Sequence, residues 1–294
     1  MATRVTLFHN PTAGLENHSK EELLQALHEK GYQTTYVDTK SDDYAEMLKE
    51  PGELVVIAGG DGTVAKIVKH LLHKDIPIGL LPLGTANNIA NSLGIAGEAA
   101  DIIAGWDLSK KKPFDVGLVN GPDGESIFFE SAGFGIFPQL ISQHSKDRDE
   151  KKSREEELES ALQHVQEILH NTEAHFCTLH MEEEQLSGDY LLVEIMNIRL
   201  AGPNMDLAPE ADPGDGLLDV VLVREDERDK LEAYIANRLR GKGNTEEWQV
   251  RRAKELQVEW SSKSYHVDDE VHESEAPISV GIRIIPDELE FLVP

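Results

Sequence analysis

The first part of the chain alternates between short apolar runs and segments with helical spacing. Residues 54–58 and 76–81 are continuous apolar runs, as expected for strands of a parallel sheet that are buried on both faces. Leucines three and four residues apart predict a helix over residues 20–30. This alternation predicts a doubly wound α/β domain over residues 1–112. The other elements expected in it are strands at 4–8 and 33–37 and helices at 44–49, 64–74 and 88–93.

The pattern changes after Lys112, where apolar runs follow one another and turn residues such as those at 121–124 separate most of them. This predicts a mainly β second domain, a sandwich, over residues 113–281. Its expected strands are 114–119, 126–130, 176–181, 190–197, 217–223 and 256–259, and two helices at 155–170 and 228–239 interrupt them. The first of these helices is heavily charged outside one apolar stripe, which favours a solvated helix over one that docks a partner.

The chain has 294 residues and a formal net charge of −27. This charge argues against nucleic acid as a partner, because phosphate contacts need clustered lysine and arginine. It also argues against electrostatic attachment to an anionic membrane. An apolar ligand would therefore enter an apolar groove and not a basic patch. Met205 and residues 134–137 are candidates for its lining, and ordinary core is the alternative for them.

Cys177 is the single cysteine of the chain, so no internal disulfide forms and a reducing compartment is favoured. The first ten residues have no long apolar core and do not resemble a signal peptide. The longest apolar runs are too short to span a bilayer. We therefore expect a cytoplasmic protein without a transmembrane segment.

A glycine-rich turn, Gly59-Gly60-Asp61-Gly62-Thr63, follows the buried run at 54–58. Glycines let the backbone turn sharply and approach a ligand closely. Free N–H groups at the start of the next helix make an anion site that suits a phosphate chain. Asp61 would act through a metal ion or a water. The turn is neither the lysine-containing P-loop nor the dinucleotide fingerprint, and taken alone it could also be an ordinary tight turn.

Two further polar loops follow strands of the same predicted sheet. Thr85 and Asn87 lie in the loop after the run at 76–81, and Asn10 follows the first strand. Loops at the carboxyl ends of neighbouring parallel strands line one crevice. The sequence therefore predicts a nucleotide site at this edge.

The acids near the C-terminus are ambiguous when read alone. Asp268-Asp269-Glu270 could be an acidic surface loop in a chain rich in acids, and residues 212–216 could be a plain β-turn. His266 lies two residues before Asp268 and could tune it or simply fill a strand. The histidines form no recognisable metal-ligand pattern.

With these motifs in order along nearly the whole chain, the sequence resembles the diacylglycerol kinase and sphingosine kinase catalytic superfamily in its soluble bacterial form. The segments that carry the resemblance are Asn10-Pro11-Thr12-Ala13-Gly14, Gly59 to Thr63, Pro82 to Asn87, Phe114-Asp115-Val116-Gly117, Asp215-Gly216-Leu217-Leu218-Asp219 and Asp268-Asp269-Glu270. The resemblance implies a nucleotide domain like those of phosphofructokinases and NAD kinases, a C-terminal β-sandwich, and a catalytic cleft between them. It also implies that a last strand at 282–294 returns to the first domain.

The resemblance implies a role for each motif. ATP contacts come from Thr39, Gly59, Gly60, Asp61, Gly62, Thr63 and Thr85, beside Asn10 and Asn87. Glu270, with Asp268 beside it, is the catalytic acidic element, and Glu270 would accept the proton of a lipid hydroxyl that attacks the γ-phosphorus of ATP. A structural Mg²⁺ lies near Asp212, Asp215 and Leu217. We expect Asp61 and Asp115 to complete the cluster of carboxylates, which requires a divalent ion beside the nucleotide.

Three motifs depart from the family pattern. Ala65 and Lys66 follow the glycine-rich turn where the family has Asn and Glu, Asn88 replaces an aspartate, and Asp269 replaces the glycine between the last two acids. These changes bear on metal affinity and turnover more than on fold.

Three functional hypotheses follow. The first is an ATP-dependent lipid kinase with a diacylglycerol-like acceptor. The second is a non-catalytic sensor that binds nucleotide or lipid on the same fold, which the three departures favour. The third is a kinase for a soluble acceptor. The acceptor and the oligomeric state stay open.

Overall fold

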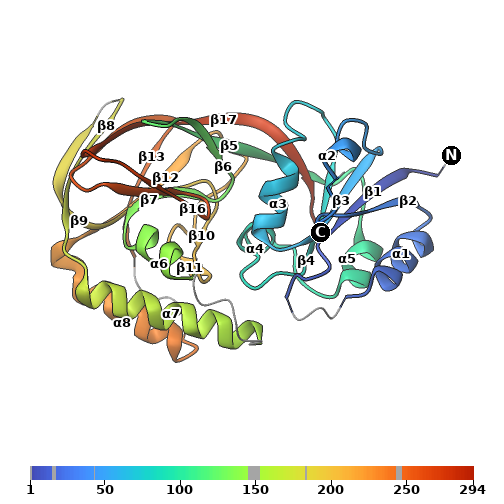
Figure 1. Cartoon of the computed structure of the whole chain (residues 1–294), viewed down its shortest axis with the longest axis horizontal. Helices are drawn as coiled ribbons and strands as arrows, with labels where there is room; N and C mark the ends of the chain where they lie inside the picture. The colour runs from blue at the N-terminus through green and yellow to red at the C-terminus, as the bar shows by residue number, and fades with distance from the viewer. Residues whose placement is uncertain (1, 15–17, 43, 145–152, 183, 243–246) are drawn as a thin grey trace. The chain divides into compact units, whose positions relative to one another are not determined.

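The computed structural model describes residues 2–14, 18–42, 44–144, 153–182, 184–242 and 247–294 (Figure 1). The chain divides into two compact units, one made of Met1–Phe114 with Asp287–Pro294 and the other of Asp115–Pro286. The strands β5 (Lys111–Gly121) and β17 (Ile278–Leu292) each contribute residues to both units.

The first unit contains a parallel sheet. Its strands are ordered β2 (Gln33–Asp38), β1 (Arg4–His9), β3 (Leu54–Gly59) and β4 (Ile78–Pro82), and Phe291 of β17 pairs in parallel with Ile78. Every residue of β3 is buried, which confirms the prediction that its continuous apolar run forms a strand buried on both faces. The strand order 2-1-3-4 is that of a doubly wound fold.

Helices cover both faces of this sheet. On one face, α1 (Lys20–Glu29) and α5 (Ala99–Gly105) bury Leu23, Leu27 and Ile103 in a cluster that includes residues of β1 and β3. On the other face, α3 (Asp61–Val68) packs against β3. The two remaining helices are short, α2 (Tyr44–Met47) and α4 (Asn88–Ser92).

The boundaries of α3 differ from the prediction of 64–74. The helix begins at Asp61 because Gly60, with φ −95° and ψ −177°, forms its extended N-cap. It ends at Val68, and the following residues form turns in which His73 has a φ of 62°. The glycine-rich turn therefore supplies the first turn of the helix rather than a loop before it. Helix α5 was missed by the sequence reasoning.

The second unit is a β-sandwich with helices packed on one side. Its strands pair in the order β16-β15-β7-β9-β8-β14-β17. Strand β12 pairs with both β9 and β13, and strand β5 pairs with both β17 and β6. The bounds of the elements not given above are β6 Gly124–Phe128, β7 Ser131–Gly135, β8 His175–Met181, β9 Gln185–Met196, β10 Leu200–Ala201, β11 Met205–Asp206, β12 Leu218–Arg224, β13 Gln249–Ala253, β14 Glu255–Trp260, β15 Ser264–Val267, β16 Glu270–Glu273, α6 Ile136–His144, α7 Arg154–Asn171, a 3₁₀ turn Glu225–Glu227 and α8 Arg228–Leu239.

Two apolar clusters stabilise this unit. The first fills the sandwich and includes Phe128, Phe134 and Trp260. The second contains residues of α6, α7, α8, β9 and β12, and the helix α7 packs in it beside α6 and α8 (Figure 1). Met205 and Phe137 belong to this second cluster and are at most 2% exposed, so they are core and not the lining of an open groove.

Cys177 gives a direct test of the sandwich core. Its side chain is fully buried in β8, and burial, assisted by the charge of Glu259, raises the pKa of the thiol to about 12. At pH 8 we expect Ellman's reagent to label the native protein on the order of 10³-fold more slowly than the denatured chain, because only the thiolate reacts. Labelling at equal rates with and without denaturant would contradict this packing.

Candidate functional site

The topological switch point of the first unit lies between β1 and β3. In open parallel sheets, ligands bind outside the carboxyl ends of the strands at this point. The segments that follow β1, β3 and β4 all begin at this edge, and they contain the predicted residues Asn10, Gly59 to Thr63, and Thr85 with Asn87. Topology therefore places the three polar loops on one rim.

The three loops are in contact. Nδ2 of Asn10 donates a hydrogen bond to Oγ1 of Thr63 at 3.2 Å. A Cβ built on Gly84 would lie 2.4 Å from the Cα of Gly60, and one built on Gly14 would lie 2.5 Å from the carbonyl oxygen of Leu83. Only glycine permits these backbone approaches, so the sequence of each loop is matched to its neighbour.

Asp61 connects two of these loops. Its carboxylate accepts hydrogen bonds from the backbone N–H groups of Asn88 at 2.9 Å and Ile89 at 3.0 Å, in the first turn of α4. Burial raises the pKa of Asp61, although these N–H groups oppose the shift. The side chain thus stabilises the N-terminus of α4, a structural use that the sequence reasoning missed.

Asn87 and Thr39 have the least exposed side chains of the candidate nucleotide ligands. Asn87 has a left-handed φ of 51°; its Oδ1 accepts from the N–H of Gly84 at 2.9 Å, and its Nδ2 donates to the Gly84 carbonyl at 2.8 Å. It therefore fixes the shape of the loop after β4. Thr39 follows β2 at the same edge and is 3% exposed, whereas Thr85 is half-buried and Gly62 is exposed.

Lys66 is built into this rim. Its ammonium group donates to the carbonyl oxygen of Thr39 at 2.6 Å and lies 3.8 Å from the ring centre of Tyr44. An ammonium group in this position is stabilised both by its hydrogen bond to the carbonyl and by its attraction to the aromatic face. Lys66 therefore ties α3 to the segment after β2.

In the second unit, Asp268 and Glu270 belong to a tight hairpin. Val267 pairs with Glu270, so Asp268 and Asp269 form the two-residue loop between β15 and β16. The carboxylate of Asp268 accepts from the N–H groups of Phe129 at 3.0 Å and Glu130 at 2.8 Å. Burial raises the pKa of Asp268 to about 6 against the effect of these donors. Asp268 is thus directed into its own unit, while Glu270 is exposed on β16.

Asp115 has a structural partner too. It is 1% exposed, and its Oδ2 accepts from the N–H of Gly216 at 2.7 Å. Asn197, which the sequence reasoning missed, donates from Nδ2 to the carbonyls of Asp115 at 2.9 Å and Phe129 at 3.0 Å. These bonds join β5, the segment before β7 and the loop at 212–216.

The loop at 212–216 offers oxygen donors of the kind that Mg²⁺ prefers. Within it, Oδ1 of Asp212 accepts from the N–H of Gly214 at 3.0 Å, and Oδ1 of Asp215 accepts from the N–H of Leu217 at 3.0 Å. Arg252 forms an ion pair with Asp215 and lies 3.5 Å from Asp219. The donor chemistry fits a magnesium ion, and Arg252 supplies a competing positive charge.

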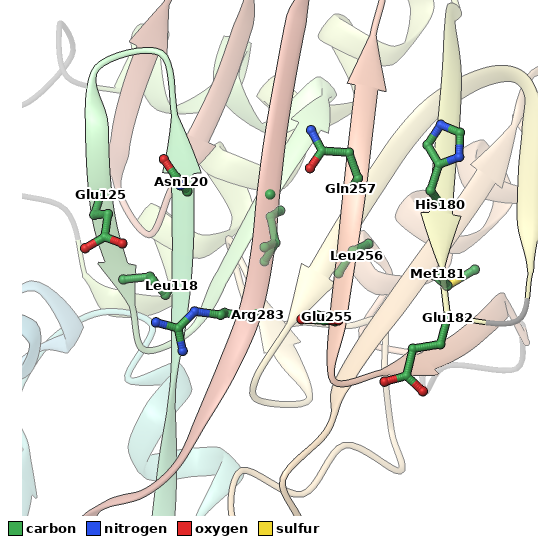
Figure 2. Close-up of a pocket in the computed structure, with 12 residues that line it drawn as sticks. Leu118, Asn120, Glu125, His180, Met181, Glu182, Glu255, Leu256, Gln257 and Arg283 are labelled. Carbon is green, nitrogen blue, oxygen red and sulfur yellow. The ribbon is translucent and has the colours of Figure 1, made fainter.

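The described residues contain no metal-ligand cluster, and a hollow among them lies away from the predicted site. No three His, Cys, Asp or Glu side chains in those parts of the chain gather as ligands for a metal ion. A hollow of about 420 Å³ lies over β5, β17, β14 and β8 in the second unit, where Figure 2 shows Leu118, Gln257, His180 and Arg283 around it. It contains none of the predicted site residues. Within the parts of the chain that the structure describes, none of the helices combines the length and the apolar composition of a membrane-spanning segment.

Comparisons with known proteins agree with this architecture. Residues 4–119 match the model of the diacylglycerol kinase catalytic domain, and residues 142–293 match the YegS C-terminal NAD kinase beta sandwich-like domain. Together they define a two-domain kinase of the lipid kinase class. The chain belongs to this diacylglycerol kinase and YegS-like family.

The names of individual relatives agree with this family. A diacylglycerol kinase of Mycobacterium tuberculosis is 26% identical over 82% of this chain and 77% of its own length. One from Bacillus subtilis is 28% identical over 76% and 74%, and a probable lipid kinase YegS-like protein of Klebsiella pneumoniae is 31% identical over 65% and 60%. A diacylglycerol kinase structure from Bacillus anthracis superimposes with a TM-score of 0.71 at 20% identity, covering 99% of this chain and 97% of that one, and shows the shared fold.

Proposed function

We propose that this protein transfers the γ-phosphoryl group of ATP to the hydroxyl of a lipid, with a diacylglycerol-like molecule as acceptor. The observation that carries the proposal is the contact of three loops at the switch point of the parallel sheet, where Asn10 reaches Thr63 and Gly60 meets Gly84. Membership of a lipid kinase family supplies the reaction class.

The first unit would bind ATP at this rim. Gly60 and the first turn of α3 offer backbone N–H groups to the phosphates. Thr63 and Asn10, which hydrogen-bond each other, would reorient toward the nucleotide, with Thr39 and Thr85 beside it. Asn87 and Asp61 would act through the loops that they hold in place, since their polar atoms are engaged with backbone groups.

The second unit would supply the general base. Glu270 is exposed at the start of β16, and its carboxylate would accept the proton of the lipid hydroxyl. The resulting oxygen attacks the γ-phosphorus in line, the bond from that phosphorus to the bridging oxygen breaks, and ADP leaves. Positioning of the two substrates accounts for most of the acceleration in this type of transfer.

Magnesium would act in two places. When bound with ATP it neutralises the charge of the phosphates. A structural ion would be held by Asp212, Asp215 and Leu217, with Asp212 and Leu217 contributing their backbone carbonyls. Asp115 would support that loop through Gly216.

The test is ATP consumption with Mg²⁺ over a panel of detergent-dispersed lipids, comparing the parent chain with Glu270→Gln. The panel contains diacylglycerol, a sphingoid base, an undecaprenol-like alcohol and phosphatidylglycerol. We expect lipid-dependent ADP release that the variant loses. ATP binding without turnover on any lipid or soluble alcohol would instead identify a nucleotide sensor. Turnover with soluble acceptors and with none of the lipids would show that the acceptor is not a lipid.

A further inference from the structure

A buried carboxylate and a buried histidine face each other across three strands of the second unit. Gly133 of β7 is paired with Glu194 of β9 on one side and with His266 of β15 on the other. Glu194 is fully buried and His266 is 3% exposed. Nε2 of His266 lies 3.0 Å from Oε1 of Glu194. The two side chains therefore meet over the central glycine.

Gly133 is required for this meeting. A Cβ at this position would lie 1.8 Å from Oε2 of Glu194 and 2.9 Å from Nε2 of His266. A side chain on β7 would occupy the space in which the two groups meet. The backbone of the middle strand is thus adapted to a polar contact inside a sheet that is otherwise apolar at this point.

The other nitrogen of His266 reaches the hairpin loop. Nδ1 lies 2.8 Å from the carbonyl oxygen of Asp268. Because a carbonyl only accepts, Nδ1 carries a proton, and Nε2 shares the remaining proton with Glu194. Burial would lower the pKa of His266, but the carboxylate of Glu194 and the Asp268 carbonyl raise it. Glu194 thus fixes the protonation of the ring that holds the loop.

The loop needs such support. Asp268 has a left-handed φ of 49°, which aspartate adopts more readily than most residues but less readily than glycine. Its carboxylate accepts from Phe129 and Glu130, and its own N–H donates to the carbonyl of Ser131 at 2.8 Å. His266 restrains the remaining polar group of its backbone, the carbonyl. Glu270 follows two residues later, so the conformation of Asp268 sets where Glu270 begins.

Stability alone does not explain the pair. A buried ion pair contributes less than well-packed apolar residues of similar size in many proteins. Strand β9 is otherwise apolar around Glu194, with Val193 and Ile195 fully buried. Backbone strain kept in place by surrounding contacts is found at functional sites.

We propose that Glu194 and His266 are positioning residues that hold the carbonyl of Asp268 and thereby the orientation in which Glu270 meets the acceptor hydroxyl. The inference rests on the function proposed above for Glu270. Glu194 and His266 would touch neither ATP nor lipid, and they would act through the hairpin loop.

The test uses two substitutions of one side chain. In His266→Asn the amide nitrogen can occupy the position of Nδ1 and keep the bond to Asp268, whereas in His266→Gln it can occupy that of Nε2 and keep only the bond to Glu194. We expect His266→Gln to lower kcat about 10- to 100-fold with KM for ATP unchanged, because misplacement of a catalytic group has effects of this size. We expect His266→Asn to be less stable than the parent, because the buried carboxylate of Glu194 loses its partner, but to keep kcat within about threefold of the parent at a temperature where both are folded, because the bond to Asp268 is kept.

Amide hydrogen exchange gives a readout that is independent of activity. His266→Gln should increase exchange at residues 129–131 and 268–270 and nowhere in the first unit, while His266→Asn should preserve the protection of residues 268–270 even if strand β9 around Glu194 exchanges faster. Equal kcat in the parent and both variants would overturn the inference. So would equal losses in both variants that follow a loss of thermal stability, with no difference in exchange between them.

Glu270→Gln is measured in parallel to separate the two proposals. If Glu270→Gln retains the parent kcat, the general-base proposal fails and the inference fails with it. If Glu270→Gln is inactive while His266→Gln is as active as the parent, the inference alone is wrong.

Discussion

Replacing Glu270 with glutamine is expected to lower kcat by roughly 10²- to 10⁴-fold, the range that a general base contributes. Glutamine has the shape of glutamate but cannot accept a proton. Glu270 is exposed on β16 and has no role in the apolar clusters, so the fold should be retained. The measurement is the steady-state rate with the preferred lipid, beside ATP affinity by calorimetry. The affinity should change less than about twofold, because in the proposed function the nucleotide binds to the first unit.

Glu273→Gln is the matched control for this experiment. Glu273 is a second exposed glutamate on the same strand, paired with Ser264. It should retain parent activity, since the same charge is lost at a different position. A rate for Glu270→Gln within threefold of the parent would remove Glu270 from the mechanism.

The second large effect is expected at the rim of the first unit. In Gly84→Ala the new methyl group would lie 2.4 Å from the Cα of Gly60 and 2.9 Å from Oδ1 of Asn87. Because both neighbours are fixed, one loop must move. We expect ATP affinity to fall at least 10-fold and the free energy of unfolding to fall by about 1–3 kcal/mol, the usual cost of overpacking. Calorimetric ATP titration and urea denaturation measure the two effects.

Gly105→Ala is the corresponding control in the same unit. A Cβ on Gly105 would meet nothing within 4 Å, and its φ is not left-handed. Alanine is favoured over glycine at such a position, so stability should be equal or slightly higher and ATP affinity unchanged. If Gly84→Ala binds ATP as tightly as Gly105→Ala, the nucleotide does not occupy this rim.

The fold was predictable from the sequence where a strand is buried on both of its faces. The continuous runs that became β3 and β4 lie on a sheet covered on both faces, so their apolar character was decisive. Strand β7 and helix α6 were missed because residues 132–137 form one short run of apolar residues and glycine in which strand passes directly into helix at Gly135, with a φ of 99°. Periodicity cannot locate such a transition.

The candidate site was only partly predictable. Motif spacing pointed to the loops that contain Asn10, Gly60 and Gly84, because parallel strands end at a common edge. It could not show that Asp61 and Asp268 direct their carboxylates to backbone N–H groups, since this depends on contacts between distant segments. One local signal was available, namely Glu194 inside the apolar run of β9, because a charged residue in a buried strand needs a partner.

The passage of β5 and β17 through both units has a consequence for biosynthesis. The ribosome delivers the first 114 residues early, yet the strand beside β4 comes from residues 287–294. Phe291 is fully buried and packs against Phe114 with ring centres 5.0 Å apart. Until translation reaches this segment, the nascent first unit has an unsatisfied apolar sheet edge at β4, open to chaperones or to pairing with another chain. Its maturation is therefore coupled to completion of the second unit.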